Sequence, residues 1–121
     1  GAWSGRFGAD LRRVLVAHPN GLPIPPAIER WMRGGRASLA GCDSPDAVMA
    51  ESLRTRPQLV LCDARGSGAA LSLDVLRRLK GDAYTAIVPT VALAASAGAV
   101  APLLKAGADE VLIEGSSAEE W

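Results

Sequence analysis

Asp63, His18 and Glu114 are the side chains whose chemistry and positions along the sequence most resemble a site. Each directly follows a short apolar run rich in Val, Leu or Ile, as is typical of strands buried on both faces of a parallel sheet. The carboxyl ends of such strands share one edge, where open α/β sheets bind their ligands. The sequence therefore predicts that two carboxylates and an imidazole meet at one crevice. Such groups can bind a cation, accept a phosphoryl group or change charge near neutral pH.

Alternating strands and helices must position these side chains. The sequence predicts strands at 14–17, 37–42, 59–62, 87–93 and 111–113, separated by helices at 27–33, 45–54, 71–80 and 97–105. Pro26 suits the first turn of the first helix, and Asp43 or Ser44 would cap the second. Leu73, Leu76 and Leu79 would face inward from the third helix and Lys80 outward. Because right-handed crossovers cover both faces of a parallel sheet, this pattern predicts a five-stranded, flavodoxin-like α/β domain.

The chain length fits one domain. At 121 residues it is long enough for one core and too short for two. Residues 1–10 are Gly-rich and are interpreted as a tail or linker, or as a vector-derived remnant, whereas residues 11–121 form the domain. Only the first turn of another helix fits after Glu114, so we expect the last helix to be truncated or replaced by another element.

Composition argues against several classes of function. Thirteen Lys and Arg residues balance thirteen Asp and Glu residues, so direct nucleic-acid binding is not expected. No apolar run reaches the roughly eighteen residues of a spanning helix, so we expect no membrane insertion and a cytoplasmic location. Cys42 and Cys62 lack a CxxC spacing or a histidine cluster, which favours small buried side chains over zinc ligands or a disulfide.

Three stretches of sequence carry a resemblance to a known family. Pro57–Asp63, Leu76–Lys80 followed by Ile87–Pro89, and Lys105–Leu112 resemble the corresponding runs of CheY-like receiver domains. The resemblance extends over residues 12–115. It implies the flavodoxin-like (CheY-like) fold with helices on both faces and a place in bacterial two-component signalling. It also implies that Asp63 occupies the position of the phosphoacceptor.

The positions that bind magnesium in the family have changed. The resemblance places the family's acidic pair on His18 and Pro19, and neither is a hard oxygen ligand. Asp63, water and the Arg65 carbonyl would by themselves bind Mg²⁺ weakly. Phosphoryl transfer without this cation loses its main electrostatic stabilisation. We therefore expect no cofactor, with Mg²⁺ required only if Asp63 is an active phosphoacceptor.

The positions that hold the phosphoryl group have changed as well. The family's hydroxyl residue after the fourth strand corresponds to Ala94, which cannot donate a hydrogen bond. Its lysine corresponds to Glu114, whose charge repels a phosphoryl group. His18, Pro19, Arg65, Ala94 and Glu114 are thus predicted to form a degenerate pocket around Asp63.

Within this pocket several interpretations stay open. Asp63 is either a phosphorylation site or a relic carboxylate satisfied by Arg65 or His18, either of which could replace the missing positive charge. His18 is either a pH-sensitive partner of the carboxylates or part of a His-Pro turn that leaves the strand. The run 66–68 is too short and lacks the lysine of a phosphate-binding loop. No catalytic residue is assigned, and the chain is not expected to be an enzyme.

The leading hypothesis is a degenerate receiver, or pseudo-receiver, that acts as a phosphorylation-independent protein-interaction or dimerisation module. Its partner would be another protein or an adjoining output or kinase domain, and a homodimer is an alternative. The family's signalling face maps to residues 97–121. A second hypothesis is a functional receiver phosphorylated on Asp63 by a histidine kinase in a phosphorelay. A third is a sensor of a small ligand such as a nucleotide second messenger, bound beyond the strand tips.

Overall fold

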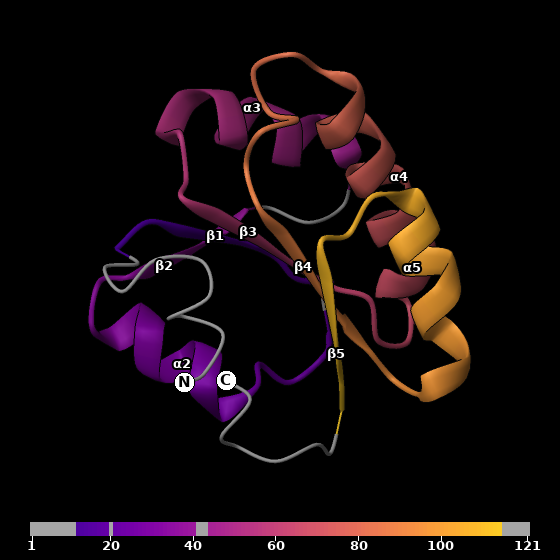
Figure 1. Ribbon diagram of the computed structural model, residues 1–121. Helices are drawn as coiled ribbons and strands as arrows, with labels where there is room; N and C mark the ends of the chain where they lie inside the picture. Colours follow the sequence, from indigo (N-terminus) through magenta and orange to yellow (C-terminus); the bar gives the residue numbers. More distant parts are fainter. Residues whose placement is uncertain (1–11, 20, 41–43, 115–121) are drawn as a thin grey trace.

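The computed structural model describes residues 12–19, 21–40 and 44–114, which contain one parallel sheet (Figure 1). The strands are β1 (Val14–Ala17), β2 (Ala37–Ala40), β3 (Leu59–Asp63), β4 (Thr90–Ala94) and β5 (Glu110–Ile113). Their order in the sheet is β2–β1–β3–β4–β5, and every neighbouring pair is parallel. The predicted flavodoxin-like (CheY-like) five-stranded sheet is therefore confirmed.

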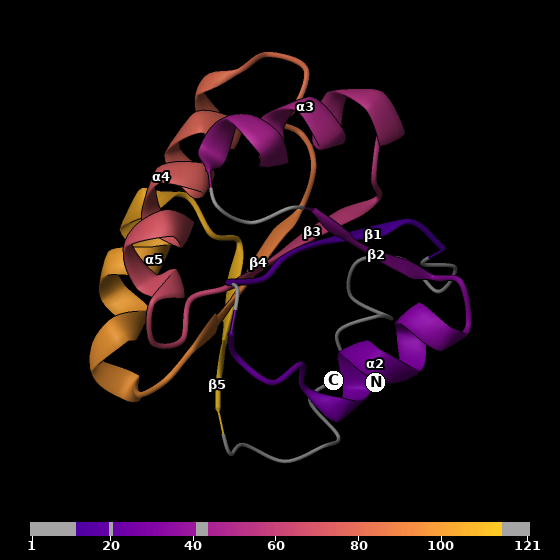
Figure 2. The ribbon, with the colours of Figure 1, turned by 180° about the vertical axis from the view of Figure 1, so that it is seen from behind.

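The helices cover both faces of this sheet. They are α2 (Pro26–Arg33), α3 (Pro45–Thr55), α4 (Gly68–Gly81) and α5 (Val100–Ala106), the last preceded by the 3-10 turn η1 (Ala97–Ala99). Helices α3, α4 and α5 lie against one face and α2 against the other, as the front and back views show (Figures 1 and 2). The three central strands, β1, β3 and β4, are buried on both sides, which explains the continuous apolar runs of the sequence.

Side chains alternate between the two faces along each central strand, and each face has its own core. Leu15, Val60 and Cys62 point toward α3, α4 and α5, where they pack with Val48 and Leu76. On the other face the core comprises Val14, Val16, Ile28, Leu59, Leu61, Val91, Leu93 and Leu112. Cys62 is completely buried, as its interpretation as a small core residue requires.

Several predicted helix signals are confirmed. Pro26 is the first residue of α2, and the Ser44 side chain caps α3 by accepting a hydrogen bond from the amide of Ala47 at 3.2 Å. Pro102 lies in the first turn of α5, where an amide has no partner within the helix. The predicted tail 1–10, the alternative cap Asp43, Cys42 and the predicted last helix lie outside the described residues.

The fourth strand begins later than predicted. It starts at Thr90 instead of Ile87, because Pro89 lacks an amide proton and can join the sheet only through its carbonyl, which accepts from the amide of Val60 at 3.0 Å. Ile87 is 85% exposed and precedes β4, so the prediction that it belongs to the fourth strand was wrong.

Helix α4 begins earlier than predicted, at Gly68 instead of Leu71. The predicted inward side chains Leu76 and Leu79 are fully buried, whereas Leu73 is only partly buried. The prediction that Lys80 points into solvent was wrong. Its ammonium group donates to the carbonyls of Ala86 and Val88 and to Asp109.

No helix within the described part of the chain is both long enough and apolar enough to cross a bilayer.

A carboxylate joins the start of β4 to the loop before β5. Asp109 Oδ2 accepts hydrogen bonds from the Thr90 amide at 2.7 Å, the Thr90 hydroxyl at 3.2 Å and Lys80 Nζ at 3.0 Å. Burial raises the pKa of Asp109, but these bonds and the Lys80 charge outweigh it and leave the pKa below its ordinary value. This carboxylate therefore holds two sheet elements together.

We predict that Asp109→Ala lowers the free energy of unfolding by about 1–2 kcal/mol, because the Thr90 amide loses its acceptor and the Thr90 hydroxyl and Lys80 each lose one of theirs. Because folding lowers the pKa of Asp109, its contribution is fully present above the ordinary carboxyl pKa and disappears as the pH falls through the folded value. Urea unfolding at several pH values measures both effects. Asp74→Ala is the control, because Asp74 is exposed and pairs only loosely with Arg77 at 3.7 Å. A difference between the variants that persists in strong acid would contradict this assignment.

Candidate functional site

The parallel register brings the predicted site residues to one edge of the sheet. Ala17 pairs with Cys62, so the next residues, His18 and Asp63, lie side by side at the carboxyl ends of β1 and β3. The strand order reverses between these two strands, which is where sheets of this class place their ligand site. The polar side chains of the crevice are thus set by the fold.

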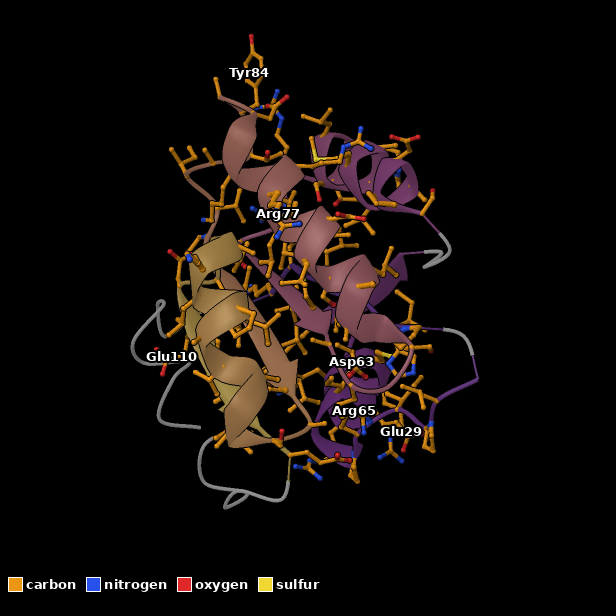
Figure 3. All side chains as sticks on the ribbon, turned by 90° about the vertical axis from the view of Figure 1, so that its right-hand side faces the viewer. Glu29, Asp63, Arg65, Arg77, Tyr84 and Glu110 are labelled. Carbon is orange, nitrogen blue, oxygen red and sulfur yellow. The ribbon has the colours of Figure 1, made fainter. Side chains whose placement is uncertain are left out.

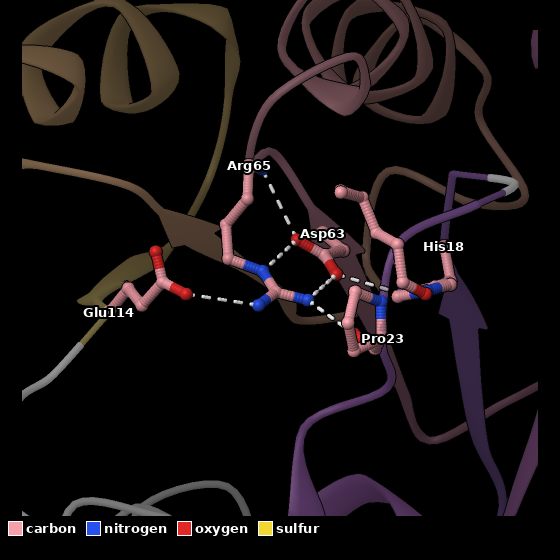
Figure 4. Close-up of polar contacts among 6 residues, drawn as sticks. His18, Pro23, Asp63, Arg65 and Glu114 are labelled. Carbon is pink, nitrogen blue, oxygen red and sulfur yellow. Dashed lines mark hydrogen bonds and ion pairs between the residues drawn. The ribbon is translucent and has the colours of Figure 1, made fainter.

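Asp63 is a fully buried carboxylate held by a guanidinium fork. Its side chain has no solvent exposure. Arg65 Nε donates to Oδ1 at 2.8 Å and Nη2 donates to Oδ2 at 2.6 Å, while the Arg65 amide also donates to Oδ1 at 3.2 Å (Figure 4). Such bidentate, charge-assisted hydrogen bonds are stronger than those between neutral groups. Both oxygens of Asp63 are therefore engaged from within the chain.

Arg65 extends this pairing to two further segments. Its Nη1 donates to Glu114 Oε1 at 3.1 Å, and its Nη2 donates to the Pro23 carbonyl at 2.9 Å (Figure 4). The hydrogen bond with Asp63 raises the pKa of Arg65 above its ordinary value, although burial opposes the rise. The guanidinium thus stands between the two carboxylates and joins the loop before α2, the end of β3 and the end of β5.

His18 approaches Asp63 from the other side. Its Nδ1 lies 2.8 Å from Asp63 Oδ2, a close ion-pair contact without the alignment of a hydrogen bond. Its Nε2 lies 2.7 Å from the Leu22 carbonyl, which can only accept, so Nε2 carries a proton. The Leu22 carbonyl thus orients the ring so that Nδ1 faces the Asp63 carboxylate.

Pro19 and Ala94, the other predicted pocket residues, are uncharged and contribute packing contacts. Pro19 packs near Gly68, where a Cβ atom would overlap both Pro19 and the Asp63 carbonyl. Ala94 is buried at the end of β4, and its carbonyl accepts from the Glu114 amide at 2.8 Å. Of the predicted residues, Arg65 and His18 touch the Asp63 carboxylate, and Glu114 reaches it through Arg65.

The donor set around Asp63 does not fit magnesium. This ion needs several oxygen ligands in octahedral geometry, but both Asp63 oxygens face a guanidinium, and the imidazole lies on one of them. A cation placed there would also meet the positive charge of Arg65. Among the described residues, no group of three His, Cys, Asp or Glu side chains is arranged to hold a metal ion.

Sequence reasoning missed the backbone part of this site. The carbonyls of Leu22 and Pro23 orient His18 and Arg65, and the close approach at Gly68 brings the start of α4 against β3. Every residue has a carbonyl, so residue type carries no signal for this role. A glycine between Ser67 and Ala69 is the one feature that could have indicated close packing.

Comparisons with known proteins support the fold. No protein-family model and no curated protein sequence matches the chain. Among solved structures, it is similar to a response-regulator receiver domain from Bermanella marisrubri, at 21% identity and a TM-score of 0.67, over 89% of each chain.

Two further neighbours have the same fold. The receiver domain of a Pseudomonas aeruginosa sensor histidine kinase, solved with magnesium in its active-site cleft, is 20% identical with a TM-score of 0.66, over 90% of this chain and 89% of its own. The phosphorylated cyanobacterial phytochrome response regulator RcpA is 15% identical with a TM-score of 0.61, over 92% of this chain and 86% of its own. The chain therefore has the fold of CheY-like response-regulator receiver domains.

Proposed function

We propose that this chain is a degenerate receiver of two-component signalling that works without phosphorylation. In this proposal it serves as a protein-interaction module for a protein partner or for an adjoining output or kinase domain. Support for the receiver class comes from the fold and its structural neighbours. Support for the loss of phosphorylation comes from one observation, the two-pronged hydrogen bonding of Arg65 to Asp63.

This fork occupies the atoms that phosphorylation needs. An acyl phosphate forms when one Asp63 oxygen attacks a phosphorus atom, which requires a free lone pair and access for the donor. Both oxygens accept hydrogen bonds from Arg65, and the side chain is fully buried. Displacing Arg65 would leave a buried carboxylate unpaired, at a cost of about 3 kcal/mol or more. The attack therefore faces a barrier that an open crevice does not impose.

Charge at the site supports the same proposal. In receivers, by the resemblance, a magnesium ion and a lysine neutralise the incoming phosphoryl group. In this chain Arg65 already balances Asp63 and contacts Glu114. Glu114 would repel the added phosphoryl charge across the same crevice. The Arg65 guanidinium thus supplies from within the chain the positive charge that the magnesium ion supplies in an active receiver.

We predict that wild-type protein neither binds a phosphoryl mimic nor accepts a phosphoryl group. Amide resonances of Asp63, Ala94 and Glu114 should not shift when beryllofluoride and Mg²⁺ are added, and acetyl phosphate with Mg²⁺ should add no phosphoryl mass. The reason is that Asp63 lacks both a free oxygen and a cation site. NMR spectra and intact-protein mass spectrometry measure these two outcomes.

A receiver with an intact acidic pair serves as the positive control for both reagents. Shifts that centre on Asp63, or a mass increase that Asp63→Asn abolishes, would establish the functional-receiver alternative and end this proposal.

We predict that Arg65→Met lowers the free energy of unfolding by about 3 kcal/mol at neutral pH, because it leaves a buried carboxylate without its fork. Arg65→Lys should fall between Arg65→Met and wild type, since lysine keeps the charge but cannot bridge both oxygens. Denaturant unfolding measures both losses.

Arg77→Met is the matched control, because Arg77 is 63% exposed and lies 3.7 Å from its partner Asp74. It should change stability by no more than about 0.5 kcal/mol. Equal effects at positions 65 and 77 would show that the fork does not hold the site together.

A further inference from the structure

The amino edge of the sheet, opposite the Asp63 site, carries an apolar groove. Figure 3 shows Tyr84 at the end of the molecule that lies farthest from Asp63 and Arg65. The groove lies between the end of α3 and the segment before β4, and Leu53, Arg56, Tyr84 and Ile87 line it. Tyr84 is 79% exposed and Ile87 is 85% exposed. Large apolar side chains gathered at one place are typical of interaction sites.

Hydrogen bonds hold these side chains outward. Between Tyr84 and Ile87, Thr85 is buried and its hydroxyl donates to the Leu79 carbonyl at 2.6 Å. Lys80 Nζ donates to the carbonyls of Ala86 and Val88 at 3.2 and 3.0 Å. The segment is therefore anchored on both sides of its exposed residues. An apolar surface that is rigid before binding loses less conformational entropy when a partner docks.

Arginines surround this groove at the same edge. Arg56 lines the groove itself, and Arg12, Arg13 and Arg36 line a neighbouring pocket at the starts of β1 and β2. Pro57 lines both pockets, so they lie next to each other, and together they are called the amino-edge surface below. None of the described residues that line either pocket is acidic. The surface therefore presents positive charge beside apolar anchors.

The arginine side of this surface is also held in place. Gln58 Oε1 accepts from the amides of Arg12 and Arg13 at 2.7 and 2.9 Å. Arg13 Nε donates to the Arg56 carbonyl at 3.2 Å, and Arg56 has the left-handed φ of 48° that most side chains avoid. Arg56 is the residue that ends α3, where a left-handed conformation is common, and its amide donates to the Ser52 carbonyl.

We propose that the amino-edge surface docks a protein segment that combines apolar side chains with carboxylates. Apolar residues of that segment would fill the groove between Leu53 and Ile87, and its acidic residues would meet Arg56 and the arginines of the neighbouring pocket. This inference rests on the proposed function as an interaction module and names where and with what it interacts. Aromatic residues and arginines are the side chains that contribute most to binding at protein interfaces.

Other occupants fit this surface less well. A nucleic acid would use the arginines but not the apolar groove, because phosphate contacts dominate such interfaces. A second copy of this chain would fit only through a surface that combines carboxylates with exposed apolar side chains. The expected signalling face around α5 offers only one large exposed apolar residue among its described residues, Leu104 at 47% exposure.

Selection of peptides from a random library displayed on phage, with the intact chain as bait, tests the proposal. Recovered peptides should be enriched in both Asp or Glu and large apolar residues. A synthetic copy of the most enriched peptide should bind wild type, and Ile87→Asp and Arg56→Glu should each weaken binding about tenfold or more. Fluorescence anisotropy measures the affinities, and circular dichroism checks that the variants fold.

Matched controls place the same charge changes elsewhere. Leu104→Asp and Arg77→Glu alter exposed residues of α5 and α4 and should stay within about twofold of wild type. The proposal is overturned if no peptide is enriched, if the enriched peptides lack carboxylates, or if the variants at positions 56 and 87 bind like wild type. It is also overturned if sedimentation velocity finds a dimer that Ile87→Asp abolishes, or if a single-stranded oligonucleotide binds and competes with the peptide.

This test and the phosphoryl-mimic test report on opposite edges of the sheet. Beryllofluoride shifts around Asp63 would refute phosphorylation independence and leave the amino-edge surface standing if the peptide still requires Ile87 and Arg56. If the peptide does not bind as predicted and beryllofluoride causes no shifts around Asp63, the docking proposal is refuted and the degenerate-receiver proposal stands.

Discussion

A buried carboxylate must be neutralised from within the protein, and the structure of this chain depends on how that is done for Asp63. The side chain lies at the end of β3 with no solvent contact, where an unpaired charge would cost several kcal/mol. The side chain of Arg65, two residues later, donates a hydrogen bond to each of the two oxygens. Because the cation belongs to the chain, it is always present. The charge of Asp63 is thus paired within the chain.

That pairing organises the surrounding loops. The guanidinium also binds the Pro23 carbonyl and Glu114, so segments that follow β1, β3 and β5 converge on one group. The His18 imidazole lies on the opposite side of Asp63, oriented by the Leu22 carbonyl. In a receiver that responds to phosphorylation, these loops must be able to rearrange when charge is added. Here both carboxylates, Asp63 and Glu114, already contact the Arg65 guanidinium.

The two edges of the sheet therefore differ in which side chains they expose to solvent. At the carboxyl edge, Arg65 pairs with both Asp63 and Glu114, whereas at the amino edge Tyr84 and Ile87 face solvent beside several arginines. Net charge is zero over the whole chain, but this sum conceals a local concentration of arginine. An interaction module needs an exposed surface with both apolar contact and charge, and the amino edge has them.

The sequence by itself determined the fold class, because alternating apolar runs and amphipathic segments leave few topologies open. It also determined that His18, Asp63 and Glu114 share an edge, since each follows a parallel strand. It misjudged Ile87 and Lys80, because apolar or charged character does not reveal which side chains a loop turns outward or inward. Only the tertiary structure decided that Arg65 bridges both carboxylates and that backbone carbonyls orient His18. Those contacts join segments far apart in the chain, and their geometry exists only after folding.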